Sequence, residues 1–254
     1  MIPFALDTFL LLFARITGLF LSAPIFGSRQ IPARIKALII VVLAASLAYF
    51  VPVEYSQVII NEVHFLAAIF IEILIGYTLG FIIYILFGAI QLSGQLMDMQ
   101  MGFGIVNVVD PQTGTQIPLL GNLTQTLALL VYLAVDGHHY LLNAIAQSYK
   151  LIPVLGLHID AGFTKLLVEI TVYMFIIAVK IATPIVIAVL TTDIAMGFIA
   201  RTVPQMNVFI VGLPLKILVG LVALFLMLPV YIWLYSVLLV RFYEYLDRIM
   251  LLMG

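Results

Sequence analysis

Residues 163–200 form an apolar run that is longer than a single upright membrane span requires. A spanning helix needs roughly 20 predominantly apolar residues. A helix satisfies its backbone polar groups within one segment, as a bilayer demands. The sequence therefore predicts an all-α integral membrane protein in which residues 1–254 form a single membrane domain. The candidate membrane segments are residues 4–26, 37–53, 65–92, 124–152, 163–200 and 206–240.

The composition agrees with a membrane protein and argues against several other classes. Of the 254 residues, 65% are hydrophobic and 9% are charged, whereas a soluble domain is nearer half apolar and a quarter charged. The net charge of −1 argues against a nucleic-acid partner. Cysteine is absent, so a disulfide framework and a thiolate metal site are excluded, and we expect no cofactor. The N-terminus lacks the pattern of a cleaved signal, so we expect the first segment to stay in the mature protein.

Charge placement orients the first segments, but simple alternation then fails. The loop GSRQIPARIK after the first segment carries Arg29, Arg34 and Lys36 without an acidic residue, and the positive-inside rule places it in the cytoplasm. The acidic loop after the second segment then lies outside. Alternation puts residues 93–123 inside, although that stretch has aspartates and no lysine or arginine. We therefore expect bent helices or hairpins among the segments.

Two segments carry internal breaks in the sequence. Residues 124–152 are interrupted near Asp136-Gly137, and we expect residues 163–200 to be broken at Pro184 and at Thr191-Thr192. Non-helical backbone at membrane depth survives only where it is buried in protein or lines water.

Small and charged side chains recur at helical spacing along the long segments. Residues three and four positions apart share a helix face, and small residues let membrane helices approach closely. A charge at the bilayer centre costs roughly 2.5–3.5 kcal/mol, so these charges either pair inside one bundle, or face a partner or an aqueous path. Because this chain has few helices with which to bury them, we favour an obligate subunit of a larger membrane assembly. The candidate assembly and helix-packing residues are Arg15, Glu72, Gly76, Gly80, Lys180, Asp193, Gly212, Lys216 and Gly220.

Few residues suggest chemistry. Asp136, His138 and His139 are the one stretch that resembles a metal site, but adjacent histidines point apart on a helix, and we favour a helix break with an interfacial histidine pair. A membrane enzyme built on Asp136 and His138 is a less favoured alternative, since it lacks a third partner at usable spacing. The sequence also contains no nucleophile motif and no nucleotide-binding motif. Glu72 and Asp193 could relay protons in a small secondary transporter, although an ion pair or a hydrogen bond at a helix contact is the favoured interpretation.

The stretch MGFGIVNVVDPQTGTQIPLLGNL, residues 101–123, is too apolar for a solvent loop and too rich in Gly and Pro for a helix. It is either a packed connector between helices or a mobile apolar segment with a function of its own. An apolar constriction excludes ions by dewetting, and flanking glycines lower the strain of opening.

An ordered set of short motifs runs across residues 9–240. In chain order they are Arg15-Ile16, Ala23-Pro24-Ile25-Phe26, Pro32-Ala33-Arg34, Glu72-Ile73-Leu74-Ile75-Gly76 with Gly80-Phe81, Gly94 with Gln100-Met101-Gly102, Val109-Asp110-Pro111, Gly137-His138, Pro204-Gln205-Met206-Asn207-Val208-Phe209, and Gly212, Pro214 and Lys216. No single motif is very specific, but their order and spacing are. Together they resemble the FliR family of flagellar export proteins and its type III secretion counterpart.

The resemblance implies a subunit of a protein export gate in the bacterial inner membrane, at the flagellar basal body. It implies bent helical hairpins packed in a spiral with FliP and FliQ, contacts with FlhB, FlhA and membrane lipid, and passage of unfolded flagellar proteins. The subunit would not be an enzyme, because a separate ATPase and the proton gradient supply energy. A subunit of a virulence-type export apparatus is the alternative. The resemblance also implies a pore plug, formed by Gly102, Phe103, Gly104, Ile105, Val106, Asn107, Val108, Val109, Asp110 and Pro111.

Overall fold

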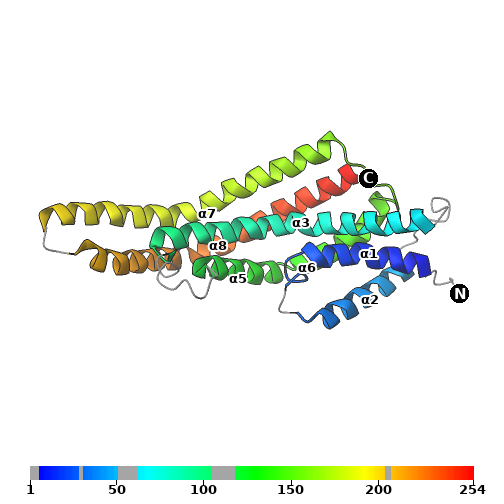
Figure 1. Cartoon of the computed structure of the whole chain (residues 1–254), viewed down its shortest axis with the longest axis horizontal. Helices are drawn as coiled ribbons and strands as arrows, with labels where there is room; N and C mark the ends of the chain where they lie inside the picture. Colours follow the sequence, from blue (N-terminus) through cyan, green and yellow to red (C-terminus); the bar gives the residue numbers. More distant parts are fainter. Residues whose placement is uncertain (1–5, 29–30, 51–61, 105–117, 204–206) are drawn as a thin grey trace. The chain divides into compact units, whose positions relative to one another are not determined.

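The computed structural model of the chain describes residues 6–28, 31–50, 62–104, 118–203 and 207–254 (Figure 1). Every regular element in these ranges is a helix, which confirms the all-α prediction for the described part of the chain. The helices are α1 (Leu6–Ser22), α2 (Ala33–Phe50), α3 (Glu62–Met101), α5 (Leu119–Ala134), α6 (Gly137–Leu151), α7 (Ala161–Thr202) and α8 (Val208–Met253).

Three of these helices, α3, α7 and α8, are long and apolar enough to cross a membrane. The bent pair formed by α5 and α6 passes the same criterion as a possible fourth span. Two helices extend past the predicted membrane segments, since α3 continues from residue 92 to Met101 and α8 continues from residue 240 to Met253. By helix length and composition the chain is a membrane protein.

The predicted interruption at Asp136-Gly137 is confirmed. Helix α5 ends at Ala134 and α6 begins at Gly137. Asp136 has a φ of 56° and a ψ of 31°, in the left-handed region that few residues other than Gly adopt. Its carbonyl accepts a bond from the backbone N–H of His139 at 3.0 Å. A single residue thus redirects the chain between the two helices.

The predicted break of the long apolar run at Pro184 and Thr191 is wrong, because α7 is continuous. Pro184 lacks a backbone donor, yet the helix continues on both sides of it. The Thr183 hydroxyl donates to the Val179 carbonyl at 2.7 Å, and the Thr191 hydroxyl donates to the Ile187 carbonyl at 2.8 Å. Threonines that bond back to their own helix satisfy their hydroxyls without ending it.

The described helices belong to two compact units. Unit 1 comprises Met1–Leu86, Tyr132–Thr171 and Leu238–Gly254, and unit 2 comprises Phe87–Val131 and Val172–Val237. Helices α3, α5, α7 and α8 each contribute residues to both units. The single membrane domain expected from the sequence stays a prediction.

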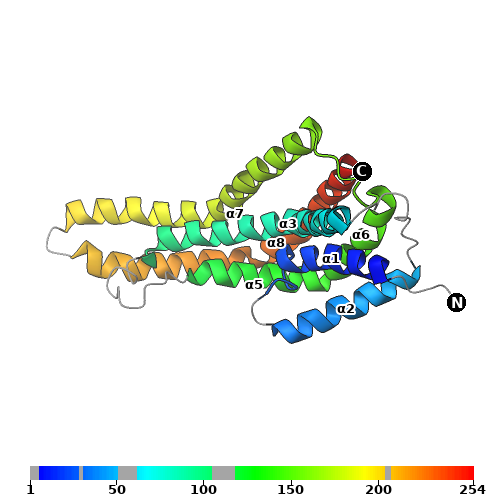
Figure 2. The same cartoon turned by 45° about the vertical axis from the view of Figure 1, so that its right-hand side comes forward.

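In unit 1, α1 packs against α2, α3 and α6. Helices α1 and α2 form a hairpin whose two arms lie side by side in both views (Figures 1 and 2). Helices α1 and α3 run parallel, because Arg15 contacts Glu72 and, farther along both helices, the Ser22 hydroxyl donates to the Tyr77 carbonyl at 2.8 Å. Apolar side chains fill this contact, with Leu19 fully buried.

Unit 2 contains two antiparallel hairpins. The end of α3 packs against the start of α5, with Asp98 close to Leu120. Helix α7 packs against α8, where Lys216 pairs with Asp193. At the other end of this hairpin the Tyr231 hydroxyl donates to the Ile181 carbonyl at 2.8 Å. In each of these two pairs, α3 with α5 and α7 with α8, the helices are neighbours in the sequence. The pairs fit the helical hairpins that the sequence led us to expect.

Candidate functional site

Arg15 of α1 lies at the centre of a fully buried polar cluster. Its Nε donates to Oε2 of Glu72 at 2.5 Å, and its Nη2 donates to Oε1 of the same carboxylate at 2.9 Å. Both side chains are 0% exposed. Such a bidentate pair between a guanidinium and a carboxylate fixes both the orientation of the two groups and the distance between them. The pair therefore holds α1 and α3 in one register.

The rest of the Arg15 guanidinium is satisfied by α6 and the residue after it. Nη1 donates to Ser148 Oγ at 2.9 Å, and Nη2 donates to the Ile152 carbonyl at 3.1 Å. The Tyr149 ring lies with its centroid 3.9 Å from Arg15 Cζ, a cation–π distance. Burial of a charge is tolerated only when its partners are in place. This cluster joins three helices of unit 1.

Glycines bring α1 and α3 into backbone contact around this pair. A Cβ added at Gly76 would lie 1.8 Å from the Arg15 carbonyl oxygen, and one added at Gly80 would lie 2.2 Å from Ser22 Oγ. On α1, a Cβ added at Gly18 would lie 2.1 Å from the carbonyl oxygen of Ile73 in α3. The faces that the sequence marked as small thus meet within this chain.

In unit 2, Lys216 Nζ lies 2.5 Å from Asp193 Oδ1, and their side chains are 29% and 32% exposed. Gly220 receives Met101 of α3, since a Cβ there would lie 2.6 Å from the methionine Cε. Gly212 is buried and Lys180 is exposed. Of the charged residues in the candidate set, the described structure thus pairs every one except Lys180.

The base of the predicted plug loop is held by Asp98, a residue that sequence reasoning did not select. Its carboxylate is 6% exposed and accepts bonds from the backbone N–H of Leu120 at 3.0 Å and of Gly121 at 3.2 Å. These are first-turn donors of α5, which have no partner inside that helix. The carboxylate also favours the positive N-terminal end of α5. Asp98 therefore fixes where the loop returns to the helices.

Gly94 and Gly121 tighten the same junction. A Cβ added at Gly94 would lie 2.4 Å from the Gly121 Cα. The loop itself leaves α3 through Gly102, whose φ of 89° suits glycine. Phe103 is half-buried and Gly104 is exposed. The remaining predicted plug residues, 105–111, lie outside the described residues.

We expect Gly94→Ala to weaken the α3–α5 hairpin, because the added Cβ would occupy the space of the Gly121 backbone. Overpacking of a tight contact costs about 1–3 kcal/mol, so the melting temperature of the protein, purified in its assembled complex, should fall by several degrees. Gly88→Ala is the matched control, since its nearest neighbour would be Met174 Cε at 3.7 Å. Equal melting temperatures for the two variants would contradict the tight junction.

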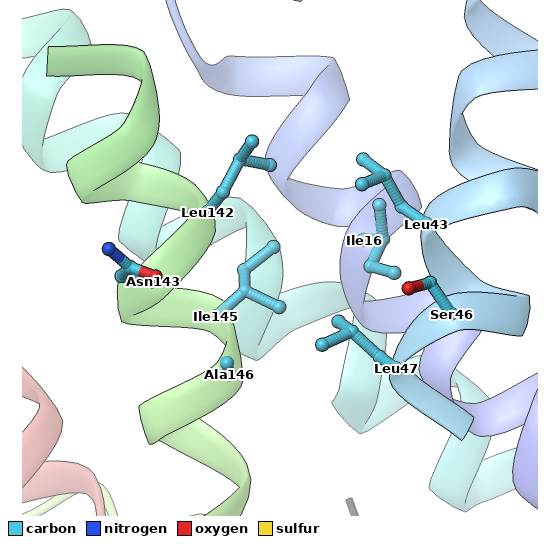
Figure 3. A pocket seen from close by; sticks show the side chains of 8 residues that line it. All are labelled: Ile16, Leu43, Ser46, Leu47, Leu142, Asn143, Ile145 and Ala146. Carbon is cyan, nitrogen blue, oxygen red and sulfur yellow. The ribbon is translucent and has the colours of Figure 1, made fainter. Parts of the chain in front are cut away.

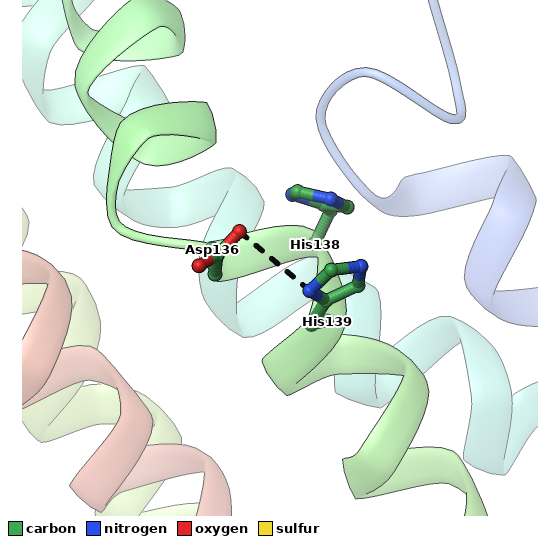
Figure 4. Close-up of side chains that lie close together, drawn as sticks. All are labelled: Asp136, His138 and His139. Carbon is green, nitrogen blue, oxygen red and sulfur yellow. Dashed lines mark ion pairs between the residues drawn. The ribbon is translucent and has the colours of Figure 1, made fainter.

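The Asp136, His138 and His139 donor atoms lie within 4.8 Å of one another at the start of α6 (Figure 4). His139 Nδ1 is 3.6 Å from Asp136 Oδ1, and both side chains are more than half exposed. A divalent ion bound by all three side chains would draw their donor atoms closer together than the 4.8 Å that encloses them here. The Asp136–His139 contact lies at the helix break that the sequence predicted.

A small apolar cavity of about 180 Å³ lies between α1, α2 and α6 of unit 1. Figure 3 shows Leu43 and Leu47 of α2 facing Leu142 and Ile145 of α6. Ser46 and Asn143 supply its polar side chains. Its lining has no acid, base or thiol, so it has the character of a packing space or a hydrocarbon site.

Comparison with known proteins gives these helices a family. A profile described as bacterial export proteins, family 1, matches residues 6–241. The chain belongs to this family. The chain is 41% identical over 229 residues to the flagellar biosynthetic protein FliR of Bacillus subtilis (strain 168), covering 85% of this chain and 84% of that protein. The family match and this identity confirm the resemblance to FliR that the sequence predicted.

Two further FliR relatives extend the match. The flagellar biosynthetic protein FliR of Pectobacterium carotovorum subsp. carotovorum is 31% identical and covers 85% of this chain and 82% of its own length. That of Escherichia coli (strain K12) is 28% identical, with the same two shares, 85% and 82%. The matches support flagellum biogenesis and protein export as the setting of this family member. The paired charges and close glycines described above all lie inside the matched residues 6–241.

Proposed function

We propose that the chain is a subunit of the gated pore that exports flagellar proteins across the bacterial inner membrane. The observation that carries the proposal is the 41% identity to FliR of Bacillus subtilis over 85% of the chain. The proposed partners are FliP and FliQ, with FlhB and FlhA beside them, at the flagellar basal body. Bent hairpins of these subunits pack in a spiral, unfolded flagellar proteins pass through it, and a separate ATPase and the proton gradient supply energy.

The exposed apolar helices support an assembled subunit. The most apolar window of α8 is only 17% buried and that of α7 is 33% buried, against 44% for α3. Apolar faces of this extent require lipid or other subunits. Helices α7 and α8 therefore offer broad apolar surfaces to neighbours in a membrane assembly.

The loop from Gly102 to Pro111 is proposed as the plug of the pore. Its sequence from Phe103 to Val109 is apolar apart from Asn107, and an apolar constriction stops ions by dewetting without binding a passing chain strongly. The Asp98 contacts with the start of α5 support a fixed base for such a plug. Gly102, with its positive φ, is the proposed pivot at the α3 end.

Two alternatives differ in testable ways. A virulence-type export subunit would share the fold, but the relatives described above all carry the flagellar name. A secondary transporter would need acids free to bind protons. Glu72 and Asp193 are each engaged with a cation instead, which favours the export subunit.

The proposed assembly predicts that the chain aggregates when it is expressed alone and becomes monodisperse when FliP and FliQ are co-expressed. The reason is that the exposed faces of α7 and α8 would be covered only in the complex. Size-exclusion chromatography in detergent with mass measurement of the eluted species checks this. Co-expression with an unrelated membrane protein is the control. A monodisperse monomer that ignores FliP and FliQ would contradict the proposal.

A further inference from the structure

Lys180 lies near the middle of an uncharged stretch of α7. From Ile170 to Thr192 it is the only charged side chain. At a rise of 1.5 Å per residue, its Cα lies roughly 15 Å from one end of this stretch and about 18 Å from the other. A bilayer core is about 30 Å thick. If the stretch spans the membrane, Lys180 lies close to the bilayer centre.

The Lys180 side chain is exposed on an apolar helix face. Ile176 and Ile187, one turn before it and two turns after it, are 44% and 56% exposed. Thr183 lies between them and is also exposed. Its hydroxyl already donates to the Val179 carbonyl, so the lysine ammonium is the polar group on this face that still needs a partner.

The described residues offer no such partner within the chain. The ion pairs and hydrogen bonds found among them leave out the Lys180 side chain. Arg15 and Lys216, the other basic residues of the candidate set, each have a carboxylate within this chain. Lys180 therefore differs from them in requiring its counter-charge from outside.

Long basic side chains near helix ends can reach the membrane surface, whereas a residue at mid-span cannot do so readily. A lipid phosphate lies at that surface, roughly 15 Å from the bilayer centre. A carboxylate carried on an apolar helix meets both needs, because the helix covers the isoleucines and brings an anion to the depth of Lys180. Polar contacts between side chains of neighbouring helices are one of the ways in which helices associate in membranes.

We infer that the α7 face formed by Ile176, Lys180, Thr183 and Ile187 docks an apolar helix of a partner subunit whose aspartate or glutamate pairs with Lys180. The inference rests on the proposed function, since it requires the export-gate assembly. It adds a specific face and a specific partner chemistry, namely one acidic residue in the middle of an apolar helix.

Cross-linking of the assembled complex in membranes by an apolar carbodiimide tests this pairing. The reagent activates a carboxylate as an O-acylisourea, and a contacting lysine amine then forms the amide while the reagent leaves as a urea. We expect a link between Lys180 and a partner acid in the unmodified complex, mapped by peptide mass. Lys180→Arg should keep the complex and lose the link, because it keeps the charge but lacks the amine. Lys165→Arg, at an exposed lysine outside the uncharged stretch, is the control and should keep the link.

Charge reversal provides the second measurement. Lys180→Glu should lower recovery of the partner subunits at least tenfold, because two carboxylates would then face each other. The inference is overturned if Lys180→Glu assembles like the unmodified chain. It is also overturned if an assembled complex gives no link at Lys180, or if the link maps to a carboxylate of this chain. These results leave the proposed function standing, whereas failure of the unmodified chain to assemble contradicts the function itself.

Discussion

Replacing Glu72 by leucine should lower the recovery of folded protein from membranes at least tenfold. The Arg15 guanidinium would keep its bonds to Ser148 and Ile152 but lose its only carboxylate, at a site that is 0% exposed. Removing one partner of a buried ion pair costs about 3–5 kcal/mol, because an uncompensated charge stays buried. Yield by size-exclusion chromatography and melting temperature in detergent, for the complex co-expressed with its partners, measure the effect.

The double variant Arg15→Met with Glu72→Leu is the informative control. It removes both charges, and replacing a buried pair by apolar residues is often neutral. The Ile152 carbonyl would lose one donor, which costs about 1–3 kcal/mol, so recovery should be partial. Asp193→Asn provides a second comparison, because its pair with Lys216 is about one-third exposed and should matter less. A double variant as damaged as Glu72→Leu alone would contradict the pairing.

The all-α fold class could be predicted from the sequence, because apolar runs of this length have few stable alternatives to a helix in a bilayer. The turn at Asp136-Gly137 was also predictable, since it depends on local residues. The continuity of α7 was not, because the threonines that looked like a break bond to the preceding turn of their own helix. Local composition does not show which way a hydroxyl will donate.

The sequence could not show which helices, or which distant residues, contact each other in the fold. The sequence marked Gly76 and Gly80 as one small face, but it did not show that α1 is the helix lying against that face in the structure. Asp98 was missed because its role depends on the N–H groups of Leu120 and Gly121, which lie beyond the loop. An isolated acid at the end of an apolar helix, just before a loop, is the signal that could have found it.

Deleting residues 103–112 should raise the ion conductance of the assembled complex by an order of magnitude or more. The deletion removes the apolar stretch from Phe103 to Val109 and keeps Gly102 and residues 113–118 as a linker. Because Asp98 already holds the start of α5 beside the end of α3, this shorter linker has a small gap to bridge. The helices should therefore assemble while the proposed seal is lost.

A length-preserving variant separates the apolar seal from mere bulk. Replacing Phe103, Ile105, Val106, Val108 and Val109 by serine keeps the loop length and removes its hydrophobic side chains. Water and ions cross a polar constriction more readily than a dewetted apolar one. This variant should therefore leak as well, while Gly88→Ala, far from the loop in sequence, should not.

Single-channel recording of the complex reconstituted in lipid bilayers tests the gated-pore proposal most directly. We predict that the unmodified complex stays closed without an exported chain, and that both the deletion and the serine variant conduct ions while retaining their partner subunits. Closed recordings from all three complexes, with subunit composition intact, would contradict the assignment of this loop as the plug.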